Sequence, residues 1–536
     1  MKKIVITLAV AAATLFAFSS CEKENLTNTS NNGVRVITAT FENDGTKTTL
    51  NADGKTPEWA VGDVLRILNA TTYQDVTLAA ENITDNKITF TTTLTGTLYA
   101  VYPASATAMT SCSDGNVSFT VPAIQDGSFA SANICVAKSS TTDETNKDNL
   151  VFCNATSVLK ITTAADVVGV DVTTANSIAG AVTASFSGSE LSLTTTSLDK
   201  KYISAVGTSA PSGNVFYLAA APVTTGSATV NCYKTDKKGT AAKDSKALQR
   251  NAIYSMDLTS VTINISSNLT GQRGILNGHE YVIIKAKYDG SHDSYRKWAT
   301  MNIGATTVTG ETSYGDYFMW GAVEKAYTSL SGTTFTFGSK PSSYINSTWN
   351  AAKCFAWENC NFTNGVYNSG KKNVFTKYTT DNAYAKSGTA DGKDVLEPAD
   401  DVAAHMWGST WRMPTGGSSG EFIALFNVTY WAWDGTDCGY YVFQPGQGTQ
   451  GSAGSHKEIN GTTDDKSKAL LFFPFAGYVS DTSLKMAGSE GCFWSSTLRS
   501  SNPAQAFGPY FATTSFNLSN NYNYRYCGRP VRPVSD

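Results

Sequence analysis

The residues Trp59-Ala60-Val61-Gly62-Asp63-Val64-Leu65-Arg66-Ile67 set the pattern for the first half of the chain. A tryptophan precedes a Gly-Asp turn, and a short segment with alternating apolar residues follows. Tryptophan in this position is typical of a core anchor, and alternation with period two is typical of a strand with one buried face. We therefore expect a β-strand at residues 64–68.

Similar segments recur on both sides of this one, with turn clusters such as Asn43-Asp44-Gly45 between them. Short strands separated by turns predict β-sandwiches. The first sandwich is expected at residues 34–160, with strands at 36–41, 64–68, 87–92, 98–102, 117–121 and 151–153. The second is expected at residues 161–263, with strands at 182–187, 191–195, 214–219, 228–233 and 252–258.

The segment from Lys47 through Ile67 and the later segment Ile253-Tyr254-Ser255-Met256-Asp257-Leu258 resemble fimbrillin-like proteins, the type V pilus subunits. The resemblance covers residues 34–262 and implies a lipoprotein with two β-sandwiches. It also implies a cut by a trypsin-like protease after a basic residue, for which Arg35 and Lys47 are the candidates. A strand from a neighbouring pilus subunit would then fill the freed groove by strand addition.

The amino end has the pattern of an export signal, with Lys2 and Lys3 before an apolar stretch that ends at Ser19-Ser20-Cys21. Small residues before a cysteine resemble a bacterial lipoprotein processing site, which implies a signal peptide at 1–20 and a lipidated Cys21. An ordinary signal peptide with an incidental cysteine is the alternative. Acyl chains contribute about 0.8 kcal/mol per buried methylene, so two or three of them would hold the protein on a membrane. Glu22 and Glu24, after the cysteine, resemble the surface-export signals of gut-type lipoproteins, which implies an outer-membrane, surface-exposed location; a solvated tether is the alternative. Residues 21–33 are polar and predict a flexible tether.

The composition excludes some functions. The chain has 536 residues, 16% of them charged, and a formal net charge of -3. Because phosphate neutralisation needs clustered Lys and Arg, nucleic acid is not an expected partner. The length predicts two or three domains.

Beyond a predicted linker at residues 264–275, tryptophan becomes frequent. The motifs that follow resemble, in order, the Fibrobacter major paralogous domain, a branch of the C-type lectin fold, and this domain is expected at residues 276–536. Its two short helices are expected at 400–407 and 420–426. The predicted fold class is mainly β, with two tandem β-sandwiches followed by an α+β C-type lectin-like domain. The motifs are 298–304, 315–321, 403–408, 411–415, 471–478 and 493–497.

Catalytic and metal chemistry are not expected. The four histidines lack the spacing of a metal site or a catalytic triad. Glu397-Pro398-Ala399 departs from the calcium-binding loop of true C-type lectins, and Asp400 and Asp401 are interpreted as the start of a helix. No cofactor is predicted. Cys354 with Cys360, or Cys492 with Cys527, are the pairs that could form a disulfide, although most thiols are expected to be buried and free.

The interval between Ser495 and Gly528 has an unusual alphabet. It is crowded with Asn, Ser, Tyr and Phe and contains no Lys, Glu, Asp, Met, His, Ile or Val. Large aromatic rings beside adaptable polar groups are typical of a binding surface. The surface is expected at 492–527, and its predicted ligand-binding residues are Leu498, Arg499, Asn502, Gln505, Phe507, Tyr510, Phe516, Asn517, Asn521, Tyr522, Asn523, Tyr524 and Tyr526.

Two explanations of this alphabet stay open. Randomising the adenines of an AAC codon never yields Lys, Glu, Gln, Met or Trp, and the interval obeys that limit except at Gln505. It therefore resembles the variable segment of lectin-fold proteins diversified by retroelements. The alternative is an ordinary Asn- and Tyr-rich ending that was never diversified.

The predicted function is a cell-surface lipoprotein adhesin rather than an enzyme. It would be stalk-mounted or placed at a pilus tip, and it would recognise a glycan or protein on host or neighbouring cells through the carboxyl-terminal face. The alternative is a surface enzyme or a polysaccharide-capture lipoprotein without a pilus role.

Overall fold

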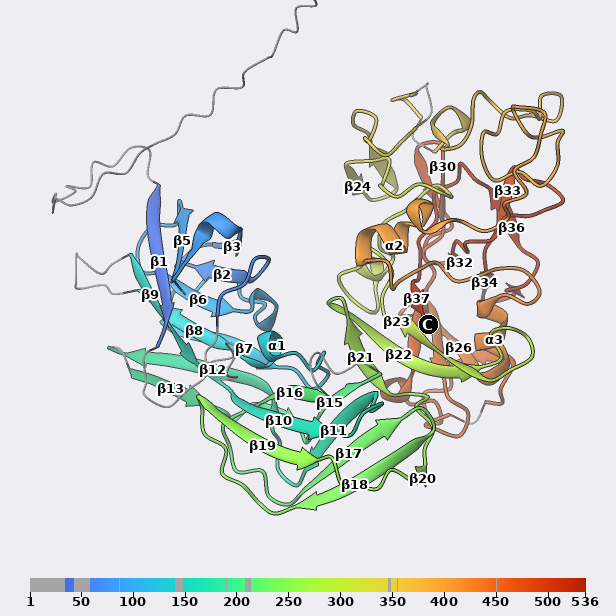
Figure 1. Ribbon diagram of the computed structural model, residues 1–536. Coiled ribbons are helices and arrows are strands. Elements are labelled where there is room, and N and C mark those ends of the chain that lie inside the picture. Colours follow the sequence, from blue (N-terminus) through green and yellow to red (C-terminus); the bar gives the residue numbers. More distant parts are fainter. Residues whose placement is uncertain are drawn as a thin grey trace, which may run out of the picture.

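The computed structural model describes residues 34–42, 58–85, 87–139, 148–188, 190–207, 214–345, 349–353, 355–449 and 451–536. The predicted signal peptide, the lipidation site Cys21, the tether, Lys47 and Cys354 lie outside these residues. The fold is mainly β, which confirms the predicted fold class. Figure 1 shows a U-shaped molecule, with the amino-terminal sheet in one arm, the second β-body at the bend and the carboxyl-terminal region in the other arm.

The first arm is an eight-stranded sheet in the order β3-β2-β6-β8-β9-β1-β5-β4. Its edge strand β3 also contacts β5: the hydroxyl of Thr92, in β5, donates to Oε1 of Gln74, in β3, at 2.7 Å. Trp59 stacks on Phe41 at 4.3 Å and is 5% exposed, which confirms the core anchor. The strands are β1 (Arg35–Phe41), β2 (Val64–Leu68), β3 (Tyr73–Thr77), β4 (Ile83–Thr84), β5 (Lys87–Thr92), β6 (Tyr99–Tyr102), β8 (Cys135–Lys138) and β9 (Asn149–Asn154).

This sheet is buried on both faces where β6 and β8 run. Ala100 and Tyr102 of β6 pack in the core around Trp59, whereas Tyr99 and Val101 pack in a second core shared with later strands. A strand buried on both faces reads as a continuous apolar run. The core that contains Tyr99 and Val101 is therefore shared by strands from both predicted sandwiches.

The second β-body contains three sheets. β7 (Asn116–Val121), from the segment assigned to the first sandwich, pairs with β12 in a sheet ordered β13-β12-β14. The other sheets are β16-β10-β19 and β15-β11-β17-β18-β20. The strands are β10 (Ser157–Thr163), β11 (Gly169–Thr174), β12 (Ala179–Ser187), β13 (Glu190–Thr194), β14 (Leu198–Lys200), β15 (Tyr202–Val206), β16 (Val215–Ala220), β17 (Ala228–Lys234), β18 (Lys237–Lys243), β19 (Ala252–Leu258) and β20 (Ile265–Ser266).

The junction with the second arm is packed. The Tyr281 hydroxyl donates to the Val206 carbonyl oxygen at 2.8 Å, and Tyr295 donates to Asp236 at 2.7 Å. Within the predicted linker, β20 extends the sheet of β18, and Leu269 is 4% exposed. Residues 264–275 thus form part of a firm contact, which limits rotation between the second β-body and the carboxyl-terminal arm.

The carboxyl-terminal arm is built from small sheets ordered β21-β22-β23-β37, β24-β25-β31-β30, β28-β26-β27-β29, β32-β34-β35 and β33-β36. The strands of the first of these sheets are β21 (Arg273–Leu276), β22 (His279–Ala286), β23 (Ser294–Ala299) and, from the carboxyl end of the chain, β37 (Val534–Ser535). The others are β24 (Ser329–Ser331), β25 (Thr334–Thr336), β26 (Tyr430–Asp434), β27 (Gly439–Phe443), β28 (Ser455–Glu458), β29 (Leu471–Pro474), β30 (Tyr478–Ser480), β31 (Ser483–Lys485), β32 (Glu490–Cys492), β33 (Gln505–Phe507), β34 (Tyr510–Ala512), β35 (Phe516–Asn517) and β36 (Tyr522–Tyr524).

The helices are short: α1 (Phe129–Ala132), α2 (Val402–Trp407) and α3 (Glu421–Val428), with 3-10 turns that include η4 (Trp357–Asn359). The side chain of Asp401 accepts from Ala403 N at 2.8 Å and caps α2, which confirms a helix start there. Among the described residues, no helix has the length and apolar character that crossing a bilayer requires.

Glu421, at the start of α3, is buried and anchors this arm. Its carboxylate accepts from Arg412 at 2.7 Å through both oxygens, and from Arg296 Nε at 2.9 Å. Burial raises the pKa of Glu421, but the Arg412 hydrogen bonds and charge outweigh it, so the net pKa is lowered. A carboxylate with a lowered folded pKa adds stability above its unfolded pKa and loses it as the pH falls through the folded value.

We expect Glu421→Gln to lower the free energy of unfolding by about 3 kcal/mol at pH 7, because two arginines lose a buried charge partner. The difference from the wild type should shrink as the pH falls below about 4, since the wild-type carboxylate then takes up a proton. Urea unfolding followed at several pH values measures it. A destabilisation of constant size from pH 7 to pH 3 contradicts the assignment.

Candidate ligand-binding surface

The ribbon of β33 and β36 presents four of the predicted residues on one side. Gln505 pairs with Tyr524 and Phe507 pairs with Tyr522 in antiparallel register. Directly opposed side chains, and those two positions apart, lie on the same face of a ribbon. The alternate residue of β33, Ala506, is 0% exposed and faces the core. In Figure 1 the ribbon lies in the half of this arm remote from the junction.

Arg499 covers one end of the ribbon. Its guanidinium carbon lies 3.4 Å from the centre of the Tyr522 ring, and Nη1 donates to Gln505 Oε1 at 2.6 Å. Asn502 Nδ2 also donates to Gln505 Oε1, at 3.3 Å. These contacts hold the side chains in one arrangement before any ligand binds, which reduces the entropy lost on binding.

Aromatic rings from two other segments extend the ribbon. Trp357 of η4 lies edge-on to Tyr524 at 5.7 Å and to Tyr526 at 5.0 Å, and Tyr367 lies 6.2 Å from Tyr524. Tyr524 is the most open of these rings, at 36% exposed. We call this surface the aromatic face; its residues are Trp357, Tyr367, Arg499, Gln505, Phe507, Tyr522, Tyr524 and Tyr526.

The aromatic face carries little charge. Burial raises the pKa of Tyr526 to about 12, and burial also raises the pKa of Tyr367. Both phenols are therefore protonated at neutral pH and can donate hydrogen bonds. Arg499 supplies the one formal charge within the defined face, and the Tyr522 ring and Gln505 already engage it. The face is suited to an uncharged or weakly charged ligand.

Three predicted residues belong to a different sheet. Tyr510 of β34 pairs with Asn517 of β35, and the Tyr510 hydroxyl donates to Glu490 at 3.1 Å. Phe516 stacks on His456 at 4.3 Å and packs against a core cluster. None of the three has a ring or hydrogen-bond contact with the aromatic face among the described residues.

The remaining predicted residues support the ribbon. Leu498 is 0% exposed and belongs to the core, so its predicted place on a ligand-facing surface is corrected. Asn521 Nδ2 donates to the Gly508 carbonyl oxygen at 3.2 Å, and Asn523 accepts from Tyr524 N at 2.8 Å. Asn521 thus ties the start of β36 to the end of β33, and Asn523 is the central residue of β36, opposite Ala506.

Trp357 and Tyr367 were missed by the sequence analysis. They come from a turn-rich segment without strand alternation, far along the chain from Tyr524. The only indication in the sequence is Trp357 itself, a large aromatic residue in a long stretch with few apolar runs. The sequence does not indicate that Trp357 contacts Tyr524 and Tyr526.

Two arginines, one inside the interval and one just after it, are part of the packed core. Arg525, inside the predicted surface, is 0% exposed and lies over Trp320 at 5.0 Å and Phe375 at 4.6 Å. Arg529 lies over Trp494 at 4.9 Å. The Trp494 indole donates to the Phe318 carbonyl oxygen at 2.8 Å. Trp494 and Arg529, which flank the interval, thus pack in the core.

The carboxylates of Glu397 and Asp400, which were considered as calcium ligands, pair with lysine and tyrosine side chains. Glu397 forms ion pairs with Lys377 and Lys393, whose hydrogen bonds lower its pKa to about 2. Asp400 binds Lys377 and Tyr378. The described residues include no cluster of three or more His, Cys, Asp or Glu side chains arranged to hold a metal ion. Cys492 and Cys527 are free, buried thiols, which corrects their proposed pairing.

A family model described as a domain of unknown function, DUF8237, matches residues 456–534. The matched segment contains β33 and β36. No curated protein matches the chain.

The chain is similar to solved structures of cell adhesion and fimbrial proteins from Bacteroides and Parabacteroides. A proposed cell adhesion protein of Bacteroides ovatus has a TM-score of 0.27 and 14% identity, covering 45% of this chain and 97% of its own. A fimbrial assembly protein of Parabacteroides distasonis has a TM-score of 0.25 and 7% identity, covering 49% and 98%. A fimbrial protein of Bacteroides ovatus has a TM-score of 0.22 and 12% identity, covering 93% and 98%.

Proposed function

We propose that this chain is a cell-surface adhesin that binds a glycan or protein ligand through the aromatic face. The observation that carries the proposal is the meeting of Trp357 and Tyr367 with Tyr524 and Tyr526 in one partly open surface. Clustered Trp and Tyr side chains dominate the binding energy of many interfaces because they bury large areas at low entropic cost.

The rest of the chain supplies the support. The packed junction at Tyr281 and Tyr295 joins the carboxyl-terminal arm firmly to the second β-body. Lipidation of Cys21 would tether the assembly to the outer membrane, surface-exposed, and residues 21–33 would give it reach.

The full chain, immobilised on beads, can be screened against a printed array of glycans and cell-surface proteins. Saturable binding to at least one array component, competed by the same component in solution, is the expected result. Binding that is uniform across the array, or absent from it, contradicts the proposal.

A polysaccharide-capture lipoprotein without a pilus role is the second candidate. It would use the same aromatic face, because sugar rings stack on aromatic side chains. Retention of a soluble polysaccharide, without adhesion of beads to cells, favours this candidate. Turnover of a polysaccharide that is lost when a carboxylate is replaced favours a surface enzyme instead.

Strand addition by pilus subunits is a further part of the proposal. β1 lies between β5 and β9, with Ile37 and Ala39 at 0% exposed, so its removal would open a groove in that sheet. Arg35 itself is held by Asp148 at 2.7 Å and by the Leu94 and Gly96 carbonyl oxygens. To cut after Arg35, a protease would first have to pull the Arg35 side chain out of these contacts. We therefore favour a cut after Lys47.

Amino-terminal sequencing of the mature protein from cells tests this preference. A chain that begins just after Lys47 is the expected product, because it has lost β1. A chain that begins just after Arg35 would retain β1 and contradict the preference.

We also propose that the interval is diversified, but only at positions whose side chains face outward. Phe507, Tyr522 and Tyr524 share the outward side of the ribbon, where substitutions are tolerated best, whereas Gln505 on the same side lies outside the codon limit. Leu498 and Arg525 are buried and are expected to stay constant. A neighbouring reverse transcriptase gene with an adenine-rich near-copy of this segment supports diversification, and its absence removes the idea.

A further inference from the structure

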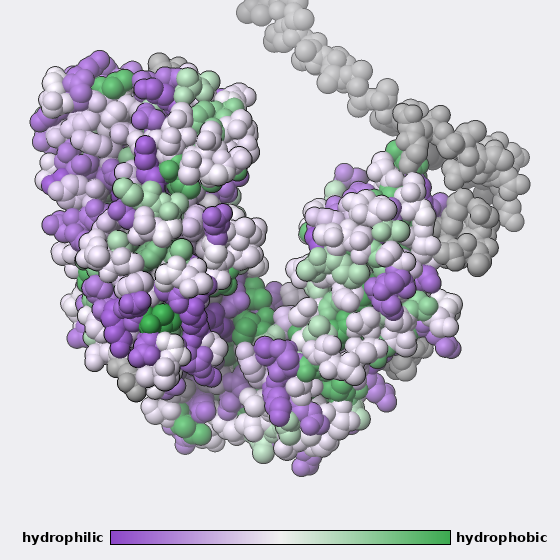
Figure 2. Space-filling model, turned by 180° about the vertical axis from the view of Figure 1, so that it is seen from behind, coloured by the Kyte–Doolittle hydropathy of each residue, from purple (hydrophilic) through white to green (hydrophobic). Residues whose placement is uncertain are grey.

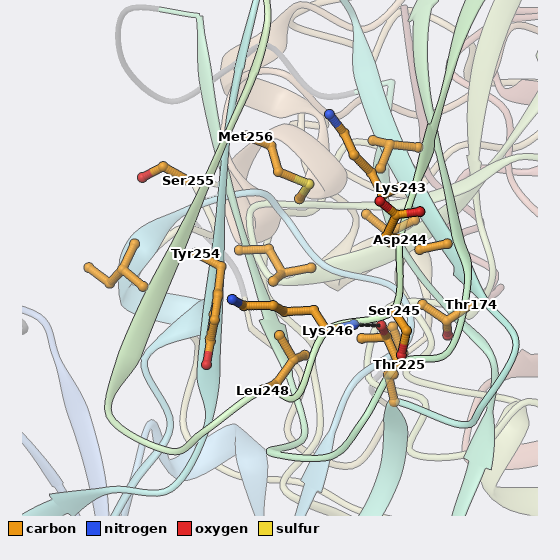
Figure 3. A pocket seen from close by; sticks show the side chains of 16 residues that line it. Thr174, Thr225, Lys243, Asp244, Ser245, Lys246, Leu248, Tyr254, Ser255 and Met256 are labelled. Atoms are coloured by element: carbon orange, nitrogen blue, oxygen red, sulfur yellow. Dashed lines mark hydrogen bonds between the residues drawn. The ribbon is translucent and has the colours of Figure 1, made fainter.

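A cavity of about 440 Å³ opens between two sheets of the second β-body, far from the aromatic face. One wall comes from β10 and β19 and the other from β11 and β17 (Figure 3). The side chains within it are mainly apolar, and its volume is in the range of pockets that bind small molecules. The apolar lining includes Leu159, Val172, Ile178, Val230, Leu248 and Met256.

Residues 243–249 form a strap across the mouth of this cavity. On one side the Tyr254 hydroxyl, from β19, donates to the Ala247 carbonyl oxygen at 3.2 Å and accepts from Gln249 N at 2.9 Å. On the other side Lys246 N donates to Thr225 Oγ1 at 3.0 Å. A peptide strand laid along β19 at this point would have to displace these bonds.

The strap also gives the mouth a positive charge. Lys243 and Lys246 both line the cavity, against the single carboxylate of Asp244 (Figure 3). Neither ammonium group forms an ion pair with a carboxylate of the described residues. The Lys246 ammonium lies 5.7 Å from the Tyr254 ring, at the edge of the apolar interior. Figure 3 shows the two ammonium groups in different parts of the cavity, so an anionic group at the edge of the apolar interior would meet the Lys246 ammonium without displacing an existing ion pair.

We propose that this cavity binds a single-chain amphiphile with a carboxylate head group, such as a medium-chain fatty acid. The alkyl chain lies among Leu159, Val230 and Met256, and the carboxylate lies beside the Lys246 ammonium group, with the Lys243 charge farther along the cavity wall. Apolar walls recognise the chain, and the charge at the mouth selects an anionic over a cationic head. This inference is independent of ligand binding by the aromatic face.

Calorimetric titration of the full chain with octanoate, decanoate and dodecanoate, each below its micelle concentration, tests the apolar part. Each added methylene is expected to tighten binding about fourfold until the cavity is filled. Dodecyltrimethylammonium, with the same chain and a cationic head, is expected to bind at least about tenfold more weakly than dodecanoate. Equal affinity for the two heads, or no binding of dodecanoate, overturns the proposal.

Two sets of variants locate the binding. Lys243→Gln with Lys246→Gln should weaken dodecanoate binding about tenfold, whereas Asp244→Asn should tighten it about two- to threefold. Ala228→Phe, which places a ring in the cavity, should abolish binding, and its matched control Ala242→Phe on the exposed side of β18 should leave binding unchanged.

Lys243 is half-buried and Lys246 is exposed, so the double lysine variant is expected to fold. It therefore tests the proposal even if Ala228→Phe does not fold. Unchanged affinity in the double lysine variant contradicts the assigned head-group site. Unchanged affinity in a folded Ala228→Phe variant contradicts the assigned cavity. Binding of a β-strand peptide that excludes dodecanoate would identify a different occupant and overturn the proposal.

Discussion

Replacing Arg532 by Ala is expected to destabilise the carboxyl-terminal arm by about 4 kcal/mol or more. Arg532 is 1% exposed. Its guanidinium donates to Asn302 Oδ1 at 2.8 Å, to the Ala299 and Thr300 carbonyl oxygens at 3.1 Å, and to the Phe472 carbonyl oxygen at 2.8 Å. Alanine leaves four buried acceptors without this donor and opens a cavity.

Charge makes this site unusual. Burial lowers the pKa of Arg532 to about 9, so the group stays charged at neutral pH although no carboxylate pairs with it among the described residues. The Phe473 ring, 4.6 Å away, and the four oxygen acceptors replace a counter-ion. Arg532→Lys should still be destabilising, by about 2 kcal/mol, because one ammonium cannot reach all four acceptors.

Urea unfolding followed by tryptophan fluorescence measures the effect, since nine of the ten tryptophans follow residue 276. Arg499→Ala is the matched control, because Arg499 is only half-buried and its loss is expected to cost about 1 kcal/mol or less. A destabilisation by Arg532→Ala no larger than that of the control contradicts the role of the buried arginine.

The second large effect concerns the ligand. Trp357→Ala is expected to weaken binding of a ligand found on the array about 30- to 100-fold, because this ring joins Tyr524 and Tyr526 at the centre of the aromatic face. Tyr524→Ala should have an effect of similar size, and its partly exposed ring can be removed without opening a core cavity. Affinity is measured by titration, and folding by the thermal unfolding midpoint.

Tyr510→Ala is the control for the aromatic face. Tyr510 is a tyrosine of the same interval and of similar half-buried character, but it lies on the sheet of β32 and β34. Its replacement should change the affinity less than about threefold. An effect of Tyr510→Ala equal to that of Trp357→Ala would move the binding site away from the aromatic face.

The alternation of apolar and polar residues predicted both ends of some strands correctly. β2 and β5 run from Val64 to Leu68 and from Lys87 to Thr92 as expected, since one side of each strand is buried and the other is not. β8 was not predicted, because its residues Cys135 to Ala137 are all buried and show no alternation. Burial on both faces depends on a distant second core, which a local pattern does not contain.

The binding surface was predicted only in part for a related reason. Composition indicates the interval, but it does not distinguish Tyr524, which is open, from Arg525, which is fully buried beside it. In the two-stranded ribbon, the period of two determines which side chains face outward, and this requires the register. Figure 2 shows hydrophilic and hydrophobic residues interspersed over the face of the molecule that it presents.

The central claim is that the aromatic face holds the ligand. Its most direct test compares the wild type with the Tyr522→Ala, Tyr524→Ala, Tyr526→Ala triple variant on the same array of glycans and cell-surface proteins, after equal folding has been verified by circular dichroism. We expect saturable binding by the wild type and none by the triple variant. Equal binding by a folded triple variant would contradict the claim.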